Sequence, residues 1–259
     1  MSAQIADVRD KIVVVDYHKG NISSVVRGLA DHGIGVISSD DPELIAAARA
    51  VVLPGVGAFG DAMSFMRESG QDEAVIDAID QGVPFLGICL GLHLLLERGN
   101  ELGAHASAGD SDTAATDATP ATSGDTAATD ATPACDKPVS PDADWEEGLG
   151  ILMGSATRLE STRLKIPHVG WDSIDLTEHG RRDPLLAGVP EGSTFYFTHS
   201  YAAADDLEWK VVAARTHYAR SFPSVVWQGN VHALQFHPEK SSRAGSVILR
   251  NFVRICDAG

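Results

Sequence analysis

The sequence has 259 residues, of which 44% are hydrophobic, and this allows one large α/β domain or two small ones. Its formal net charge of −16 excludes nucleic acid as an expected partner, because phosphate binding needs a concentrated basic surface. No apolar run approaches the roughly 20 residues that cross a bilayer, and no signal-peptide core follows Met1 to Asp10, so we expect a cytoplasmic protein without a membrane partner.

Strand and helix signals alternate over the first hundred residues. The run Lys11 to Tyr17 is typical of a buried parallel strand, and Asn21 to Ala30 shows apolar residues at helical spacing. Further strands are predicted at Ile34 to Ser38, Ala50 to Leu53 and Pro84 to Ile88, and further helices at Pro42 to Ala50, Asp61 to Glu68, Asp72 to Gln81 and Leu90 to Arg98. This alternation indicates a doubly wound α/β unit.

A polar segment from about Ala104 to Asp144 interrupts this pattern. It consists largely of Ala, Thr, Asp, Ser and Pro, and its decapeptide Asp112 to Ala121 recurs unchanged at Asp125 to Ala134. Such a composition cannot pack a core, so we interpret the segment as a disordered surface insertion. One of the three cysteines, Cys135, lies in it. Because the three are widely spaced, they indicate neither a disulfide framework nor a zinc site, and a reducing compartment fits them.

After the insertion, strands separated by short turns are predicted. They cover Ile151 to Leu159, Ser173 to Leu176, Thr194 to His199, Lys210 to Thr216, Val225 to Gln228 and Val231 to Gln235. A helix from Ser241 to Cys256 closes the chain. We therefore expect one α/β domain over residues 1–259, with a mixed, largely parallel sheet flanked by helices and the insertion at about 104–144.

The segment from Pro84 to Gly91 runs from an apolar strand into a helix, with Cys89 between two glycines. This is the pattern of a nucleophile elbow, whose tight turn exposes the central residue at the carboxyl edge of the sheet. The turn also puts the sulfur at a helix N-terminus, which favours thiolate. An inert buried cysteine between packing glycines explains the pentapeptide equally well.

The loop Pro54-Gly55-Val56-Gly57 follows a predicted strand, so it should lie at the same carboxyl edge. The amide of Gly55 or Val56, together with that of Leu90, could hold the oxygen of a tetrahedral intermediate. An ordinary Pro-Gly turn is the alternative, and without the cysteine it would be preferred.

A general base and its orienting group are predicted at the end of the last strand. His237 precedes Pro238 and is therefore extended, so His237 and Glu239 can face one site. An imidazole can take a thiol proton and return it to a leaving amine, while a carboxylate fixes its tautomer. The residues Cys89, His237 and Glu239 therefore form a candidate catalytic triad.

These motifs resemble those of the class I glutamine amidotransferases, and within that family those of the glutaminase subunits of imidazole glycerol phosphate synthases. The elbow at Cys89 and the His-Pro-Glu sequence at His237 carry the first resemblance. The second covers nearly the whole chain apart from the insertion. It is carried by Val15-Asp16-Tyr17 with Gly20-Asn21, the loop from Pro54 to Gly60, Pro167 to Trp171, and Phe236 to Ser242.

The resemblance implies a thioester mechanism in which Cys89 attacks the glutamine carboxamide, His237 transfers the protons and Glu239 orients His237. It also implies a heterodimer with a (βα)₈-barrel cyclase subunit. The ammonia would pass through a channel to that subunit, which makes imidazole glycerol phosphate and an aminoimidazole carboxamide ribotide in histidine biosynthesis. No metal or bound cofactor is implied.

The same resemblance implies further contacts. Glutamine would meet Gly57, Ser200 and Tyr201, and the cyclase would meet Asn21, Trp171, Tyr196 and Lys240, although plain packing or a solvated charge is the alternative for each. His93 stands where the family usually has a substrate-contacting glutamine, one helical turn after the nucleophile. Because imidazole can donate a hydrogen bond, we interpret His93 as a functional replacement that binds glutamine. Asp172 stands where asparagine is common.

Three other functions stay open at this point. The chain could be an amidotransferase of another pathway, which the Pro-Gly-Val-Gly and Pro-His-Val-Gly-Trp motifs disfavour. It could be a catalytically silent binding subunit, or a cysteine hydrolase acting on peptides or esters. Only the favoured function predicts glutamine turnover that rises when a cyclase is added.

Overall fold

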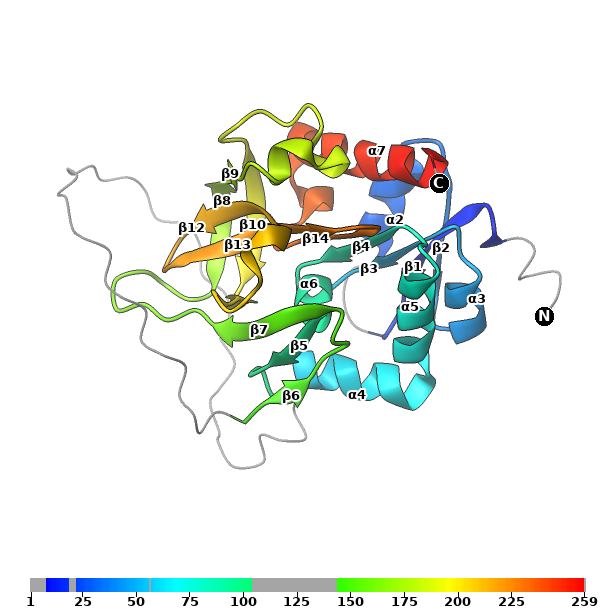
Figure 1. The fold of residues 1–259 in the computed structure, drawn as a ribbon, viewed down its shortest axis with the longest axis horizontal. Helices are drawn as coiled ribbons and strands as arrows, with labels where there is room; N and C mark the ends of the chain where they lie inside the picture. Colours follow the sequence, from blue (N-terminus) through cyan, green and yellow to red (C-terminus); the bar gives the residue numbers. More distant parts are fainter. Residues whose placement is uncertain (1–7, 19–21, 56, 104–143, 259) are drawn as a thin grey trace.

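The computed structural model describes residues 8–18, 22–55, 57–103 and 144–258. The predicted insertion at about 104–144, with its repeated decapeptides and Cys135, lies outside these residues except for Asp144. A large mixed sheet with helices on both faces forms the centre of the described part (Figure 1), which confirms the predicted fold class. None of the helices in those ranges is long and apolar enough to cross a membrane.

The central sheet has eight strands in the order β2-β1-β3-β4-β14-β13-β12-β9. Five neighbouring strands are parallel, namely β2 (Gly35–Ser39), β1 (Lys11–Val15), β3 (Ala50–Leu53), β4 (Phe85–Ile88) and β14 (Val231–Leu234). Three antiparallel strands extend it, namely β13 (Ser221–Gln228), β12 (Val212–His217) and β9 (Asp175–Leu176). The carboxyl ends of the parallel strands therefore share one edge.

Two helical layers cover the sheet, on opposite faces. The first contains α3 (Pro42–Ala46), α4 (Phe59–Ser69) and α5 (Gln71–Asp80), and the second contains α2 (Ile22–Ala30) and α7 (Ser242–Ala258), seen above the sheet in Figure 1. Alternate residues of β1 enter the two cores, since Val13 packs with the first layer and Val14 with the second. A strand with apolar residues on both faces is buried on both, as its sequence predicts.

Two smaller sheets add to the predicted architecture. One has the order β11-β7-β5-β6, from Tyr201–Ala203, Leu152–Arg158, Leu96–Gly99 and Glu146–Glu147, and the other pairs β10 (Thr194–His199) with β8 (His168–Ser173). Short 3₁₀ turns lie between the later strands at Gly180–Arg182, Pro184–Leu186 and Trp209–Val211, and a further one at Pro238–Lys240 lies between β14 and α7.

The predicted helix from Leu90 to Arg98 is wrong in its second half. The helix α6 covers only Leu90–Leu94, and the chain continues as β5, which pairs with β7. The leucines of this segment are compatible with either structure, because a short apolar run has no decisive period. Pairing with a strand more than 50 residues later in the sequence decides between them. Similarly, α3 ends at Ala46 rather than continuing to Ala50.

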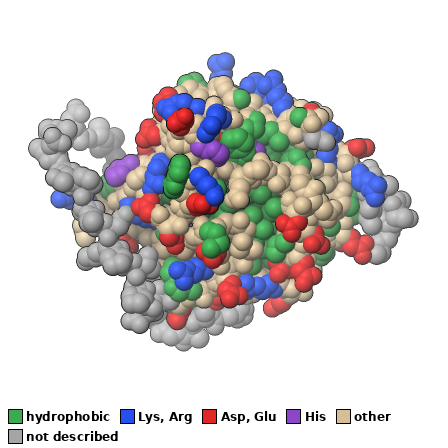
Figure 2. All heavy atoms as spheres, in the orientation of Figure 1, with side chains coloured by type: hydrophobic (Ala, Val, Ile, Leu, Met, Phe, Trp, Pro, Cys, Tyr) green, Lys and Arg blue, Asp and Glu red, His purple; other side chains and the backbone are tan. Residues whose placement is uncertain are grey.

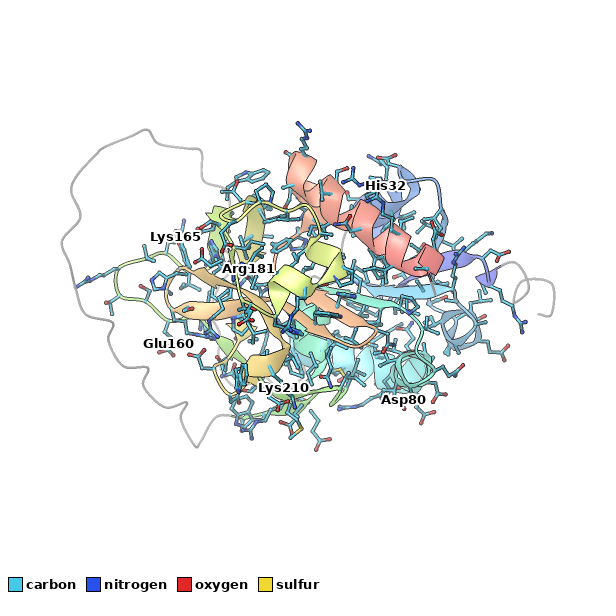
Figure 3. All side chains as sticks on the ribbon, turned by 45° about the horizontal axis from the view of Figure 1, so that its top comes forward. His32, Asp80, Glu160, Lys165, Arg181 and Lys210 are labelled. Atoms are coloured by element: carbon cyan, nitrogen blue, oxygen red, sulfur yellow. The ribbon has the colours of Figure 1, made fainter. Side chains whose placement is uncertain are left out.

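Charged side chains lie mostly on the outside. On the face shown in Figure 2, Lys and Arg side chains are interspersed with Asp and Glu side chains rather than gathered into one basic surface. Glu160, Lys165 and Lys210 are exposed and lie at the periphery of the ribbon in Figure 3.

Candidate active site

Cys89 lies in the sharp turn between β4 and α6. Its backbone has φ 54° and ψ −104°, an unusual conformation for a residue with a side chain, and its N–H donates to the carbonyl oxygen of Leu234 at 2.7 Å. The flanking glycines are required by close packing. A Cβ on Gly91 would overlap the carbonyl oxygen of Leu53, and one on Gly87 would lie 2.8 Å from the carbonyl oxygen of Gly91. These constraints are those of the predicted nucleophile elbow.

The loop after β3 meets this elbow. A Cβ on Gly55 would overlap the Cβ of Leu90, so only glycine lets the loop approach the start of α6 so closely. As the first residue of α6, Leu90 has an N–H that no carbonyl of its own helix can accept. Gly55 and Leu90 are therefore side by side, as predicted for an oxyanion hole, whereas Val56 lies outside the described residues.

His237 and Glu239 form a buried pair at the end of β14. The Nδ1 atom of His237 is 2.8 Å from Oε1 of Glu239, and the two side chains are only 3% and 4% exposed. The His237 N–H donates to the carbonyl oxygen of Tyr196, and the carbonyl oxygen of His237 accepts a 2.6 Å hydrogen bond from the Ser241 hydroxyl. The backbone on both sides of the imidazole is thus fixed by neighbouring elements.

The charge around His237 favours its protonated form. Burial alone lowers the pKa of His237, but the adjacent Cys89 thiol and the Glu239 carboxylate outweigh burial and raise the pKa to about 9. Within the described residues, Nε2 of His237 has no hydrogen-bond partner of regular geometry. This nitrogen is the one left to exchange a proton at the Cys89 side.

One pocket brings together all four residues predicted to bind substrate. It has a volume of about 410 Å³, and its walls include Gly55, Gly57, Cys89, Leu90, His93, Glu101, Pro167, Thr198, His199, Ser200, Tyr201 and Lys240. His93 lies on the predicted side of α6 and is 3% exposed. Its Nε2 atom, however, is 2.8 Å from Oε1 of Gln235, so this imidazole is already hydrogen-bonded in the free chain.

The pocket wall also contains Glu101, which the sequence motifs did not identify. Burial raises the pKa of the Glu101 carboxyl group to about 7, and a hydrogen bond from the Phe59 N–H to Oε2 opposes this shift. A carboxylate in a partly buried pocket is a group that a cationic ligand would stabilise in its charged form. Its only sequence signal is an acidic residue between two nearby glycines, too common to be informative.

Only some of the residues predicted to contact a partner lie near one another in the structure. Trp171 on β8 is 52% exposed, and its ring lies edge-on to that of Tyr196 on β10, with centroids 6.1 Å apart. Val169 on the same strand is 55% exposed. Lys240 is exposed and reaches the pocket wall, while Asn21 lies outside the described residues. Exposed aromatic and aliphatic side chains on one short strand are typical of a protein-binding surface.

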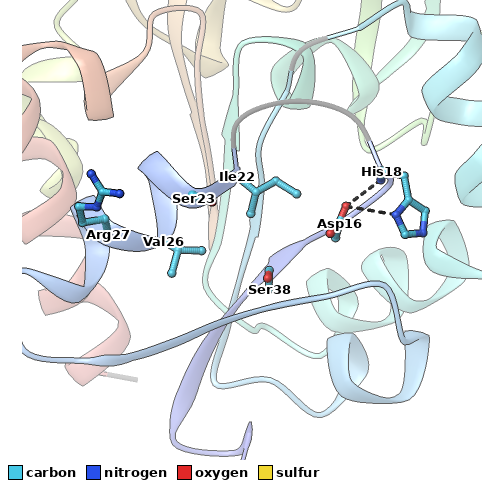
Figure 4. Close-up of a pocket in the computed structure, with 7 residues that line it drawn as sticks. All are labelled: Asp16, His18, Ile22, Ser23, Val26, Arg27 and Ser38. Atoms are coloured by element: carbon cyan, nitrogen blue, oxygen red, sulfur yellow. Dashed lines mark hydrogen bonds and ion pairs between the residues drawn. The ribbon is translucent and has the colours of Figure 1, made fainter.

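A second hollow, of about 600 Å³, lies between the ends of β1 and β2 and the start of α2 (Figure 4). It is lined by Asp16, His18, Ile22, Ser23, Val26, Arg27 and Ser38, with Asp16 bound to the backbone N–H of His18 at 2.7 Å. None of the predicted catalytic residues lines it. Across the ranges that the structure describes, no group of three His, Cys, Asp or Glu side chains is arranged to hold a metal ion.

Comparison with known proteins identifies the family of the chain. The family model of the class I glutamine amidotransferases matches residues 13–256. The subunit HisH of imidazole glycerol phosphate synthase from Symbiobacterium thermophilum is 39% identical over 248 residues, which are 95% of each chain. The HisH subunit from Chloroflexus aurantiacus is 36% identical over 249 residues, 95% of this chain and 97% of that one.

Solved structures of more distant proteins share the fold. A putative GMP synthase protein from Thermoplasma acidophilum has a TM-score of 0.57 at 19% identity and covers 96% of this chain and 94% of its own. The PurLQS structure from Thermotoga maritima has a TM-score of 0.60 at 14% identity, covering 95% and 98%. The chain belongs to the class I glutamine amidotransferases and, among them, to the family of HisH subunits of imidazole glycerol phosphate synthase.

Proposed function

We propose that this chain is the glutaminase subunit of an imidazole glycerol phosphate synthase and that Cys89, His237 and Glu239 perform its chemistry. The observation that carries the proposal is the meeting of two independent elements. The elbow conformation puts Cys89 on the wall of the 410 Å³ pocket, and the buried His237–Glu239 pair lies close enough for Cys89 to raise the pKa of His237. A thiolate–imidazolium pair is the form needed for attack on a carboxamide.

The first half-reaction forms a thioester. The Cys89 sulfur attacks the carboxamide carbon of glutamine, and the charge that develops on oxygen is held by the N–H of Leu90 together with an amide of the Gly55–Val56 loop. His237 gives its Nε2 proton to the departing nitrogen, so that the carbon–nitrogen bond breaks and ammonia leaves. Glu239 keeps the proton-transferring nitrogen directed at the sulfur and stabilises the imidazolium.

The second half-reaction releases glutamate. His237, now neutral, takes a proton from water, the oxygen attacks the thioester carbon, and the Cys89 thiolate leaves. Glutamine is held by Gly57, Ser200 and Tyr201, which line the pocket. The Glu101 carboxylate supplies an opposite charge for the α-ammonium group of the substrate, and the bound ammonium would lower the pKa that burial has raised.

The ammonia is used by a second subunit. We infer a heterodimer with a (βα)₈-barrel cyclase that contacts Asn21, Trp171, Tyr196 and Lys240, receives ammonia through a channel and forms imidazole glycerol phosphate and aminoimidazole carboxamide ribotide. The exposed Trp171 and Val169 support this interface. A thiol nucleophile and the second free cysteine, Cys256, suit a reducing compartment, so we assign the enzyme to the cytoplasm.

The test is the rate of glutamate formation from glutamine with and without the cyclase and its nucleotide ligand, for wild type and Cys89→Ala. We expect turnover that depends on both the partner and Cys89. Turnover by the free chain at the same rate would favour a cysteine hydrolase, and turnover that survives Cys89→Ala would refute the proposed nucleophile. Trp171→Ala is the matched interface control, because it should weaken stimulation by the cyclase without changing the fold.

A further inference from the structure

Three buried side chains form a continuous hydrogen-bonded row behind the pocket. Nε2 of Gln235 lies 3.6 Å from the sulfur of Cys89, and Oε1 of Gln235 lies 2.8 Å from Nε2 of His93. The exposed fractions of Gln235, His93 and Cys89 are 0%, 3% and 6%. The row joins two elements, since Gln235 follows β14, His93 lies on α6 and Cys89 is the residue before α6.

The side-chain amide of Gln235 is useful to the sulfur in only one orientation. An amide has a donor end and an acceptor end, and a thiolate can only accept. With the NH₂ group toward Cys89, the amide stabilises the anion, whereas the reversed amide would direct a carbonyl oxygen at it. Something must hold the amide in the first orientation. The backbone of Gln235 is fixed by its N–H bond to the carbonyl oxygen of Ser224, but this leaves the side-chain amide free to turn over.

His93 supplies the missing constraint. Burial lowers the pKa of His93 to about 4, so the imidazole is neutral near pH 7 and carries one N–H. With that proton on Nε2, His93 donates to Oε1 of Gln235 and so directs the NH₂ group at the sulfur. The neighbouring Arg220 acts in the same direction, since its positive charge also opposes protonation of His93.

We propose that His93 and Gln235 are a positioning pair for the nucleophile: Gln235 donates a hydrogen bond to the Cys89 thiolate, and His93 acts through Gln235 by fixing its amide. This inference rests on the proposed role of Cys89 and deepens it. It also gives His93 a role different from the one expected from sequence, because its donor is directed at Gln235 rather than at glutamine.

Other titratable groups also surround the Cys89 thiol. His237 is the cation beside it, and the pocket walls add Glu101, His199, Tyr201 and Lys240. A single hydrogen bond to a charged group corresponds to a shift of roughly one to two pKa units.

The test is the rate at which iodoacetamide alkylates Cys89 as a function of pH, followed by mass spectrometry of the peptide that contains it. The full chain is used without glutamine or partner, so the result does not depend on whether the protein proves to be a glutaminase. We expect Gln235→Met to raise the apparent thiol pKa by about one to two units and His93→Leu by about half to one unit. His93→Gln should preserve the wild-type profile, since its amide can still donate to Gln235.

The double variant His93→Leu/Gln235→Met separates positioning from a direct effect. If His93 acts only through Gln235, the double variant will have the profile of Gln235→Met alone. Effects that add, or an unchanged thiol pKa in Gln235→Met, would overturn the proposal. Should thermal melting show that Gln235→Met is unfolded, the comparison of His93→Leu with His93→Gln decides, because equal profiles for these two variants would also overturn it.

Discussion

The proposed nucleophile and the proposed base of this site are held in different ways. Cys89 is positioned by the backbone, because Gly91 and Gly55 let chain segments approach so closely that a single methyl group would not fit. His237 is positioned by hydrogen bonds to Glu239, Tyr196 and Ser241. An added methyl group overlaps fixed backbone atoms and cannot be accommodated in part, whereas the hydrogen bonds around His237 can be removed one at a time. Substitution of the glycines around Cys89 should therefore abolish activity completely. Removal of single hydrogen bonds around His237 should reduce activity in steps.

The largest effect is expected from Gly91→Ala. The new Cβ would overlap the carbonyl oxygen of Leu53, so β3 or α6 must move. We expect a loss of about 3 kcal/mol in the free energy of unfolding, measured with urea, and no measurable glutamine turnover. Gly229→Ala is the control, because it adds a methyl group in open space at φ 60° and should cost only about 1–2 kcal/mol with normal activity. A Gly91→Ala protein with wild-type stability would contradict the conclusion that close backbone packing positions Cys89.

The second effect concerns the base. Glu239→Gln keeps the shape of the side chain but removes the charge that steadies the His237 imidazolium. We expect kcat/KM for glutamine in the complete synthase to fall by roughly 10³- to 10⁴-fold while the fold is retained. An NMR titration should show the pKa of His237 falling from about 9 toward its ordinary value. An unchanged histidine pKa would mean that Glu239 does not orient it.

Glu101 lines the pocket, and substituting it tests how much the burial of this carboxyl group costs in the free energy of unfolding. Its pKa in the folded chain is raised from 4.5 to about 7, so the neutral acid is the favoured form. Stability from this group is therefore full below pH 4.5 and is lost as the pH rises through 7. We expect Glu101→Gln to match wild type below about pH 4 and to be more stable by roughly 3 kcal/mol at about pH 8, as the amide cannot ionise.

The same variant should bind glutamine less well, because it lacks the charge for the α-ammonium group. A rise in KM with little change in kcat is the expected kinetic result in the complete synthase. Equal stability of the two proteins at alkaline pH would show that water reaches Glu101 and that the carboxylate is not strained by burial.

The smallest effect is expected from Ser241→Ala. The Ser241 hydroxyl accepts from the Tyr196 N–H at 2.9 Å and donates to the His237 carbonyl oxygen, and the side chain is fully buried. Removing it leaves a donor and an acceptor without this partner, so we expect a loss of about 1–2 kcal/mol in stability and roughly a tenfold fall in kcat. If Ser241→Ala lost as much stability and activity as Gly91→Ala, the expectation that the hydrogen bonds around His237 contribute separately would be wrong.

Much of the site could be predicted because its signals are local. The glycines around Cys89 and the proline after His237 restrict the backbone within a few residues, and the apolar runs of β1 and β3 indicate a parallel sheet. The geometry of the turn at Cys89 and of the His237–Glu239 pair follows from these short-range restraints. The class of fold follows from the alternation of strands and helices, and both were available from the sequence.

The parts that could not be predicted depend on distant contacts. Helical spacing places His93 on the side of α6 that faces the pocket, but its partner Gln235 is 142 residues away in the sequence. The strand β5 forms because β7 and β6 pair with it, and Glu101 reaches the pocket because β5 directs the chain there. No local pattern encodes these pairings, and a leucine-rich run alone suits a helix equally well.

The most direct test of the account is to look for the thioester itself. The complete synthase would be mixed with isotopically labelled glutamine, quenched in acid during turnover, and the peptide that contains Cys89 analysed by mass spectrometry. We predict a glutamyl group on Cys89 in the wild type, its absence in Cys89→Ala, and labelled glutamate released as the adduct decays. Glutamine consumption with no adduct on Cys89, together with full activity of Cys89→Ala, would contradict the central claim.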